Sequence, residues 1–401
     1  MTLSEELQWR GFVNQTTLTD IKQLDSQKLT FYWGVDPSAD SMTVGNLAMA
    51  MMVRHFISHG HKAILLVGGA TGMIGDPDGK TEERELKAPE QVAKNKAGIA
   101  AEYQRIFSGQ PFELVDNYDW FKGIGYLDFL REVGKHFSMT QLLDRDFVQS
   151  RIGQGGRGIS YAEFSYSLIQ GYDFLHLFRT KGATLQVSGA DQWGNSISGV
   201  DLIRKLEGRS AHIWTGPMIM NAATGKKFGK SEDGAVWISA EKTPVFDFYQ
   251  FWLNVDDSGV DHYLKIYTLL GKEEIDQIMA EFIKNPGARA AQKALAYEVT
   301  KIVHGTEQAD TAREAVEALA RGEASDAVPT HKLASSSANI ATLLVDSGLA
   351  PSRSHAQRLL EQGGVKLNRQ KITEAQLTVK DGDILQAGKR NFVRLAVADE
   401  S

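Results

Sequence analysis

The stretch KAILLV at Lys62–Val67 runs directly into GGATGMIGDP at Gly68–Pro77. A short apolar run that ends in glycines is typical of a buried strand followed by a tight turn. The earlier stretch KLTFYWGVDP at Lys28–Pro37 has the same form, with aromatic residues stopped by Gly34 and Pro37. Helical patterns follow both stretches. Together they predict βαβ units, a parallel sheet, and a ligand crevice at the carboxyl ends of its strands.

Strand and helix patterns also alternate in the rest of the first 235 residues. Residues 183–187 predict a strand that leads into Ser188–Asn195 and a helix to Leu206, and the apolar segment 213–220 precedes a lysine-rich loop. Helical spacing of apolar residues predicts one or two helices within residues 1–28. Residues 88–150 are predicted to be mostly helical, with one helix at 126–137.

The glycines of the first stretch also fit a dinucleotide-binding pattern. Gly69, Gly72 and Gly75 match the G-x-x-G-x-x-G of extended short-chain dehydrogenases, but a lone glycine motif is weak evidence. In a dinucleotide fold the motif follows the first strand, and a ribose-binding acid follows about 20 residues later. Here the motif follows a second strand and leads to Asp76-Pro77 and a charged segment, which disfavours a dehydrogenase.

Composition narrows the class of protein. The chain has 401 residues, 42% of them hydrophobic, which suffices for two or three domains, and it has no cysteine for disulfides or thiolate chemistry. No apolar run approaches the roughly 18 residues of a membrane span, and no signal peptide is evident, so we expect a cytoplasmic protein. The net charge is −6, yet residues 331–401 carry ten basic and seven acidic side chains. This C-terminal part is the expected nucleic-acid contact.

The loop KKFGKSEDG at Lys226–Gly234 holds three lysines within five positions. Ammonium groups on a mobile loop suit a reaction whose transition state spreads negative charge over phosphate oxygens. The alternative is a solvated surface turn, which so short a pattern also fits.

A second candidate lies at Ser160–Phe174, where Tyr166, Gln170 and Asp173 share one face if the segment is helical. Polar groups on an otherwise apolar helix need partners if they are buried. They form either an internal hydrogen-bond network or a site for a ligand with an amine and a hydroxyl.

The pattern changes after the lysine loop. From Thr243 to about Arg321 helical stretches follow one another without a clear strand. We therefore expect an α/β domain at residues 1–235 and an all-helical domain at 236–325. Small polar residues predict a linker at 326–338. The last segment, 339–401, is predicted to contain two helices and then short strands.

These motifs, in this order, closely resemble those of bacterial tyrosyl-tRNA synthetases over essentially the whole chain. The matching stretches are FYxGxDP at 31–37, TVGN at 43–46, GGATGxIGDP at 68–77, EFSY at 163–166, DQWGN at 191–195 and KFGKS at 227–231. TVGN stands at the family's H-I-G-H position and KFGKS at its K-M-S-K-S position. The resemblance implies a Rossmann-like class I catalytic domain, which activates L-tyrosine with ATP and transfers it to tRNA(Tyr), and a C-terminal S4-like RNA-binding domain.

The resemblance also implies roles for single residues. Tyrosine would be bound through its phenol by Tyr32 and Asp173, through its amine by Asp76, Tyr166 and Gln170, and near its carboxylate by Gln192. ATP would be bound by Gly34, Asp36, Ser38, Gly45, Gly189, Asp191, Lys80, Arg84 and Lys230, and by backbone near Ile219 and Met220. The catalytic groups would be Lys227, Lys230, Ser231, Thr43 and Asn46. RNA would contact Arg353, Arg358, Lys366, Arg369 and Lys371, with Lys389, Arg390 and Arg394. Mg²⁺ would arrive with ATP rather than occupy a protein site, and the chain would form a homodimer through segment 129–137.

Two residues depart from the family pattern. Thr43 and Asn46 replace both histidines of H-I-G-H; asparagine keeps a donor amide and threonine only a short hydroxyl, so we expect a weakened phosphate contact.

Two other classes of protein fit parts of the chain. A catalytically silent RNA-binding relative would lose the lysines or the phenol-binding pair, and this chain keeps both. An enzyme that activates another amino acid, such as tryptophan, would lose the pair Tyr32 and Asp173.

Overall fold

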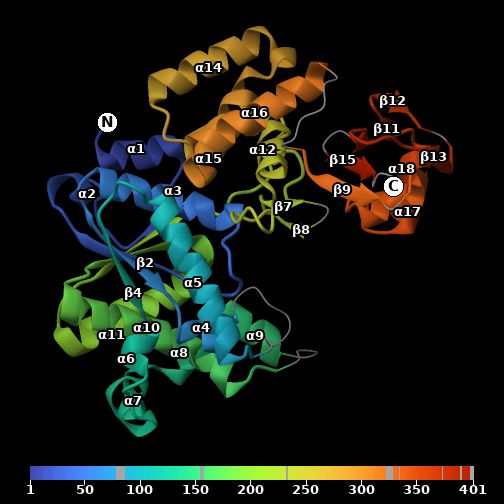
Figure 1. Cartoon of the computed structure of the whole chain (residues 1–401). Coiled ribbons are helices and arrows are strands. Elements are labelled where there is room, and N and C mark those ends of the chain that lie inside the picture. The colour runs from blue at the N-terminus through green and yellow to red at the C-terminus, as the bar shows by residue number, and fades with distance from the viewer. Residues whose placement is uncertain are drawn as a thin grey trace. The chain divides into compact units, whose positions relative to one another are not determined.

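The computed structural model describes residues 1–77, 86–153, 158–231, 234–321, 328–333, 335–372, 374–388 and 391–397. The chain divides into two compact units (Figure 1), which are Met1–Phe228 with Lys265–Tyr267, and Gly229–Leu264 with Thr268–Ser401. The first unit is an α/β structure around one sheet. The second contains helices followed by a small sheet.

A six-stranded sheet forms the centre of the first unit, in the order β1-β6-β5-β2-β3-β4. Its strands are β1 (Gln15–Thr16), β2 (Thr30–Val35), β3 (Lys62–Val67), β4 (Phe112–Asp116), β5 (Leu185–Gly189) and β6 (His212–Gly216). All neighbours pair in parallel except β1, which is antiparallel to β6. The chain adds β3 and β4 on one side of β2 and then β5 on the other. The strand order therefore reverses between β2 and β5, where open α/β sheets bind ligands.

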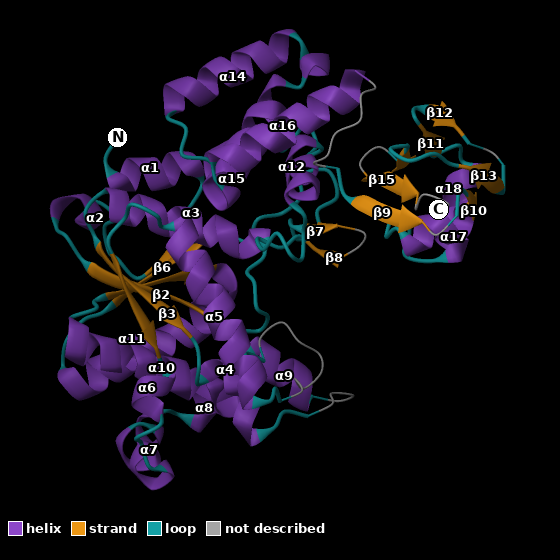
Figure 2. Ribbon diagram, viewed as in Figure 1, coloured by secondary structure: helices purple, strands orange, loops and turns teal. Residues whose placement is uncertain are grey.

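Helices cover both faces of this sheet (Figure 2), with α3 (Val44–Ser58) and α5 (Pro89–Ile106) on one face and α10 (Tyr161–Lys181) and α11 (Trp193–Glu207) on the other. Successive side chains of β2 alternate between the two layers. The Phe31 ring lies 5.2 Å from Phe56 of α3, and the Tyr32 ring lies 5.2 Å from Phe174 of α10, between centroids. Because both faces are covered, β3 is a nearly continuous apolar run.

The segment between α5 and α10 differs from the prediction. Residues 88–150 contain the strand β4, which the sequence did not reveal because two of its five side chains are exposed and none is fully buried. The helix predicted at 126–137 ends at Glu132, and a 3-10 turn follows from Gly134, a residue that disfavours the helix interior. The short helices of this unit are α2 (Gln23–Ser26), α4 (Thr71–Ile74), α6 (Tyr118–Phe121), α7 (Tyr126–Glu132), η1 (Gly134–His136), α8 (Met139–Leu143), α9 (Asp146–Ile152) and η2 (Ala190–Gln192).

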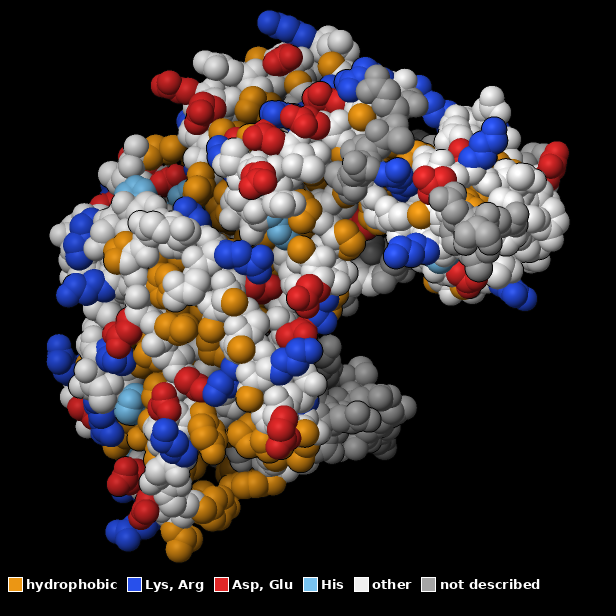
Figure 3. Space-filling model, in the orientation of Figure 1, with side chains coloured by type: hydrophobic (Ala, Val, Ile, Leu, Met, Phe, Trp, Pro, Cys, Tyr) orange, Lys and Arg blue, Asp and Glu red, His pale blue; other side chains and the backbone are white. Residues whose placement is uncertain are grey.

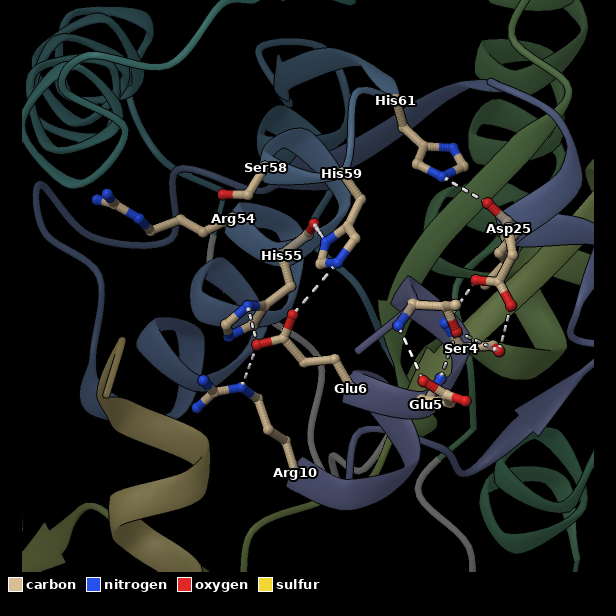
Figure 4. Close-up of polar contacts among 12 residues, drawn as sticks. Ser4, Glu5, Glu6, Arg10, Asp25, Arg54, His55, Ser58, His59 and His61 are labelled. Carbon is tan, nitrogen blue, oxygen red and sulfur yellow. Dashed lines mark hydrogen bonds and ion pairs between the residues drawn. The ribbon is translucent and has the colours of Figure 1, made fainter. Parts of the chain in front are cut away.

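A polar cluster ties the N-terminal helix α1 (Leu3–Arg10) to α3 (Figure 4). Glu6 Oε1 accepts from Arg10 Nε at 2.9 Å and lies 3.2 Å from His55 Nδ1, while Glu6 Oε2 lies 3.5 Å from His59 Nε2. Burial alone would raise the pKa of Glu6, but the hydrogen bonds and charges of His55 and Arg10 bring it down to about 2. Glu6 is therefore ionised at neutral pH and balances a buried guanidinium.

The second unit begins with the pair β7 (Lys230–Ser231) and β8 (Gly234–Ala235) and continues with helices. They are α12 (Val245–Leu253), α13 (Val260–Tyr267, whose last turn belongs to the first unit), α14 (Lys272–Lys284), η3 (Pro286–Ala288), α15 (Ala290–His304) and α16 (Thr306–Arg321). Residues 245–321 thus contain helices and no strand, as the sequence predicted. Among the described residues, none of the helices combines the length and the apolar character that crossing a membrane requires.

A five-stranded sheet, ordered β12-β11-β14-β15-β9, follows with its own core. Its elements and their neighbours are β9 (Thr330–Leu333), β10 (Ser337–Asn339), α17 (Ile340–Asp346), α18 (Arg353–Glu361), β11 (Val365–Leu367), β12 (Gln370–Lys371), β13 (Gln376–Thr378), β14 (Ile384–Ala387) and β15 (Asn391–Val397). The segment 326–338, predicted to be a linker, instead contributes β9, which pairs in parallel with β15, and most of β10. Both are short edge strands with no fully buried side chain, so their composition resembles a loop.

Candidate active site

The turns that follow β2 and β3 meet at Asp36. Thr71, at the start of α4, donates from Oγ1 to Asp36 Oδ1 at 2.6 Å, and the Tyr166 hydroxyl of α10 donates to Asp36 Oδ2 at 2.7 Å. A Cβ added at Gly68 would lie 2.2 Å from both Asp36 Oδ1 and Thr71 Oγ1. The glycines after β3 therefore allow two turns to approach closely, which explains them without a dinucleotide.

Tyr32 and Asp173 lie on the side of the sheet that α10 covers. Tyr32 is 2% exposed, and its hydroxyl has no hydrogen-bond partner among the described residues. Asp173 is equally buried; its Oδ1 accepts from Trp120 Nε1 at 2.9 Å and its Oδ2 from Asn117 Nδ2 at 3.1 Å. Two donors thus orient the carboxyl group, while Tyr32 keeps an unused donor in a buried position.

Burial shifts the ionisation of this pair. It raises the pKa of Asp173 to about 8, although the hydrogen bonds from Asn117 and Trp120 act in the opposite direction. Burial raises the pKa of Tyr32 well above its ordinary value, and the charge of nearby Asp173 adds to that shift. Tyr32 is therefore a neutral hydroxyl at physiological pH. A ligand hydroxyl between the two groups would meet a donor on one side and a carboxyl on the other.

A second set of acidic groups lies beside Tyr166. Asp76 Oδ2 accepts from Gln192 Nε2 at 2.7 Å, and its Oδ1 lies 3.5 Å from Asn195 Nδ2, which joins the turn after β3 to η2 and α11. Burial raises the pKa of Tyr166 well above its ordinary value, and the charges of Asp36 and Asp76 raise it further. A positive group is favoured where carboxylates gather, so this part of the crevice suits an amine.

The face predicted on residues 160–174 is present on α10. Tyr166 and Asp173 both belong to an internal hydrogen-bond network, through Asp36 and Asn117 respectively. Gln170, between them on the same face, is half-buried. An internal hydrogen-bond network and a ligand site are therefore compatible on this helix, because the network fixes the side chains that surround the crevice.

The residues predicted to bind ATP, together with the predicted catalytic residues Thr43 and Asn46, lie at the ends of β2 and β5, in the turns that follow them, and at the start of α3. They are Gly34, Asp36, Ser38, Thr43, Gly45, Asn46, Gly189 and Asp191. Thr43 is the N-cap of α3, and Asp191 is exposed within η2. Lys80 and Arg84 lie outside the described residues. Within the described ranges, no group of three or more His, Cys, Asp or Glu side chains is arranged to hold a metal ion.

The lysine loop leaves the first unit through a short hairpin. Phe228 N donates to Ile219 O at 2.9 Å, and the Phe228 side chain is buried, whereas the neighbouring Lys227 is exposed. Lys230 and Ser231 form β7 in the second unit, and their side chains lie outside the described ones. A buried aromatic residue thus anchors one end of the loop beside an exposed lysine.

The basic residues predicted to contact RNA lie on α18 and on the β11–β12 hairpin. They are Arg353, Arg358, Lys366, Arg369 and Lys371, all exposed or half-exposed. A Cβ added at Gly363, just after α18, would lie 3.5 Å from Lys371 Nζ, so helix and hairpin adjoin. Arg394 is half-buried in β15, and Lys389 and Arg390 lie outside the described residues.

Two residues that connect the site, Asn117 and Trp120, were not predicted from the sequence. Asn117 Nδ2 donates to Thr71 Oγ1 at 3.0 Å as well as to Asp173, and Asn117 Oδ1 accepts from Ala70 N at 2.6 Å. Trp120, four residues after β4, is the second donor to Asp173. The signal that would have found both is β4, because residues directly after a parallel strand reach the crevice.

Comparisons with known proteins agree with this architecture. The family model of class I tRNA synthetases (W and Y) matches residues 24–321, and the S4 domain model matches residues 340–385. The tyrosine--tRNA ligases of Bacillus caldotenax and Geobacillus stearothermophilus are 43% and 42% identical to the chain, each over 99% of it and 97% of their own length. A C-terminally truncated mitochondrial tyrosyl-tRNA synthetase of Aspergillus nidulans is 28% identical, with a TM-score of 0.72 over 79% of this chain and 94% of that one. The chain therefore belongs to the bacterial tyrosyl-tRNA synthetases, with a class I catalytic domain and an S4 domain.

Proposed function

We propose that the chain activates L-tyrosine with ATP, giving tyrosyl-adenylate and pyrophosphate, and transfers tyrosine to the 3′ end of tRNA(Tyr). The observation that carries the choice of amino acid is the buried Tyr32 hydroxyl, which lacks a partner among the described residues and lies near the oriented carboxyl group of Asp173. A tyrosine phenol satisfies both groups. Phenylalanine would leave them unpaired, which is costly in a buried site.

This pair would set specificity over phenylalanine. The general example of such discrimination, about 10⁵-fold without editing, is itself a tyrosyl-tRNA synthetase. Asp76, Tyr166 and Gln170 would hold the α-amine of tyrosine, supported by the acidic character of this part of the crevice. Gln192, bonded to Asp76, would lie near the carboxylate.

Activation needs no nucleophile from the enzyme. The tyrosine carboxylate attacks the α-phosphorus of ATP and pyrophosphate leaves, so the protein must align the reactants and stabilise the departing charge. Gly34, Asp36, Gly189 and Asp191 would bind the nucleoside. The phosphates would contact Ser38, Thr43, Gly45, Asn46, Lys80, Arg84, Lys227, Lys230 and Ser231. Mg²⁺ would enter with ATP.

Further proposals concern assembly and RNA. The domains proposed are a catalytic domain at 1–235, a helical domain at 236–325, and an RNA-binding domain that begins at β9 rather than at residue 339, because β9 pairs with β15. The basic groups of α18 and the β11–β12 hairpin would bind tRNA phosphates. A homodimer would use the apolar side chains around α7 to α10, which include Tyr126, Leu127, Met139 and Tyr161, all more than half exposed. Hydrophobic atoms gather on the surface around α7 (Figure 3). We assign the protein to the cytoplasm, where tRNA and ATP are available.

The test is amino-acid-dependent ATP–pyrophosphate exchange, with tyrosine, phenylalanine and tryptophan measured side by side. Exchange with tyrosine alone is expected. Exchange with tryptophan instead would contradict the assignment of the phenol-binding pair. Absence of exchange with all three would favour a silent RNA-binding relative, and tRNA(Tyr) binding would then be retained.

A further inference from the structure

We propose that Thr43 is a positioning residue of the ATP site, which fixes the side-chain amide of Asn46 so that Nδ2 is the group presented to the nucleotide. The proposal rests on the assignment of this crevice to ATP. It gives a joint role to the two residues that replace the family's histidines.

The two residues share a pair of hydrogen bonds at the start of α3. Asn46 Oδ1 accepts from Thr43 N at 3.1 Å and from Thr43 Oγ1 at 3.0 Å. A backbone N–H can only donate, so the amide atom that faces it must be the oxygen. The threonine hydroxyl supplies a second donor to the same atom. The backbone donor opposes a flip of the amide, because the flip would bring Nδ2 against that N–H.

The other end of the amide is left open. Nδ2 of Asn46 makes no hydrogen bond within the described part of the chain, and the side chain is half-buried. Amide oxygen and nitrogen diverge from one carbon, so an oxygen held toward Thr43 directs the N–H₂ group away from it. The result is an oriented, uncharged donor that does not titrate near neutral pH.

The position of α3 relative to the sheet identifies what this donor faces. Met49 lies one turn later on the same face of α3, and its sulfur is 3.9 Å from a Cβ added at Gly189, the last residue of β5. Its Cε is 2.9 Å from a Cβ added at Gly216, at the end of β6. The N-terminal half of α3 therefore lies near the carboxyl ends of β5 and β6, beside the reversal of strand order where the nucleotide is expected.

This arrangement changes the role expected of Thr43. Its hydroxyl hydrogen is engaged by Asn46, so it is not available as a donor to the phosphates. Thr43 acts through Asn46, and loss of the hydroxyl should matter only while the Asn46 amide is present. A residue that touched ATP directly would lose its own contribution whatever stood at position 46.

The experiment is a double-mutant cycle in ATP–pyrophosphate exchange with the full-length protein, using Thr43→Val, Asn46→Ala and the double variant, with Thr43→Ser as the control that keeps the hydroxyl. Thr43→Val should lower kcat/KM for ATP about three- to tenfold, the value of one hydrogen bond, and leave the KM for tyrosine unchanged. Thr43→Ser should stay within about twofold of the unmodified protein. In the Asn46→Ala background, Thr43→Val should cause no further loss.

Three results would overturn the proposal. They are an unchanged kcat/KM for ATP in Thr43→Val, losses that multiply in the double variant, and a parallel rise of the KM for tyrosine, which would indicate general damage to the fold. If the unmodified protein showed no exchange, the proposed function would fail, and calorimetric titration with ATP would test the inference separately. There, Asn46→Ala should weaken binding, and the double variant should bind as weakly as Asn46→Ala alone; a weaker double variant would refute positioning.

Discussion

Replacing Tyr32 by phenylalanine should stabilise the unliganded protein. Tyr32 is 2% exposed and its hydroxyl has no partner among the described residues, so the folded state keeps a buried donor unpaired. Such a group costs about 1–3 kcal/mol. Phenylalanine removes it and keeps the ring that packs 5.2 Å from Phe174. We expect the unfolding free energy of the first unit to rise by about 1–2 kcal/mol, or a Tm increase of about 2–4 °C per kcal/mol.

The same change should reduce specificity. The hydroxyl of Tyr32 is available only to a substrate that carries a hydroxyl, so kcat/KM should fall about tenfold for tyrosine and stay level or rise for phenylalanine. Stability and specificity would then move in opposite directions. A hydroxyl that binds substrate would show these opposite effects, whereas a hydroxyl that only stabilises the fold would lower stability when it is removed.

Tyr103→Phe provides a matched control. Tyr103 is also buried in the first unit, but its hydroxyl donates to Leu66 O at 3.2 Å, so its removal should lower stability by about 1 kcal/mol. Thermal unfolding without ligands and exchange with both amino acids measure the two effects. The reasoning is refuted if Tyr32→Phe destabilises as Tyr103→Phe does, or if the preference for tyrosine over phenylalanine is unchanged.

Three further predictions concern pH, the N-terminal cluster and the RNA-binding hairpin. Because burial raises the pKa of Asp173 to about 8, the folded state favours the proton, so the unfolding free energy should fall as pH rises from about 4 to 8; Asp173→Asn should remove that part of the slope in denaturation at several pH values. Glu6→Gln deprives the buried Arg10 of a carboxylate and should cost about 3 kcal/mol in urea denaturation at pH 7, whereas an unchanged midpoint would exclude a stabilising role for the pair. Arg369 has a left-handed backbone, with φ 70°, at the tip of the β11–β12 hairpin. The Arg369 guanidinium also donates to Ala320 O. Arg369→Gly relieves the backbone but loses that hydrogen bond, so the unfolding free energy should change by less than about 1 kcal/mol, while the salt slope of tRNA binding should fall by about one; an unchanged slope would remove Arg369 from the interface.

The sequence revealed those parts of the fold in which burial leaves a pattern. The strands at Thr30–Val35 and Lys62–Val67 are covered on both faces, so their apolar runs and terminal glycines were readable. Strand β4 and the edge strands β9 and β10 have no fully buried side chain, and their hydrogen bonds come from distant segments. Local composition cannot report such pairing, which is why β4 was expected to be helical and β9 to be a linker.

The candidate site also contains residues that local sequence patterns could not identify. Tyr32 could be named because it lies in a matched stretch, and Asp173 because it lies on the polar face predicted for residues 160–174. The residues that orient Asp173 belong to neither pattern. Asn117 becomes part of the site through its place after β4 and through hydrogen bonds to two segments at least 46 positions away. Polar residues of this kind are recognised only after the strand order is known.

The hydrogen bonds of the candidate site distinguish side chains that the protein itself holds in place from donors that remain available to a ligand. Asp36 is held by Thr71 and Tyr166, and Asp173 by Asn117 and Trp120. By contrast, the hydroxyl of Tyr32 and the Nδ2 of Asn46 have no partner in the described structure. Unpaired donors in a preorganised crevice lower the stability of the empty protein, and a ligand that pairs them recovers that free energy as affinity. One such donor lies beside the proposed phenol site and the other beside the proposed nucleotide site, so each substrate would have a donor that the empty protein leaves unused.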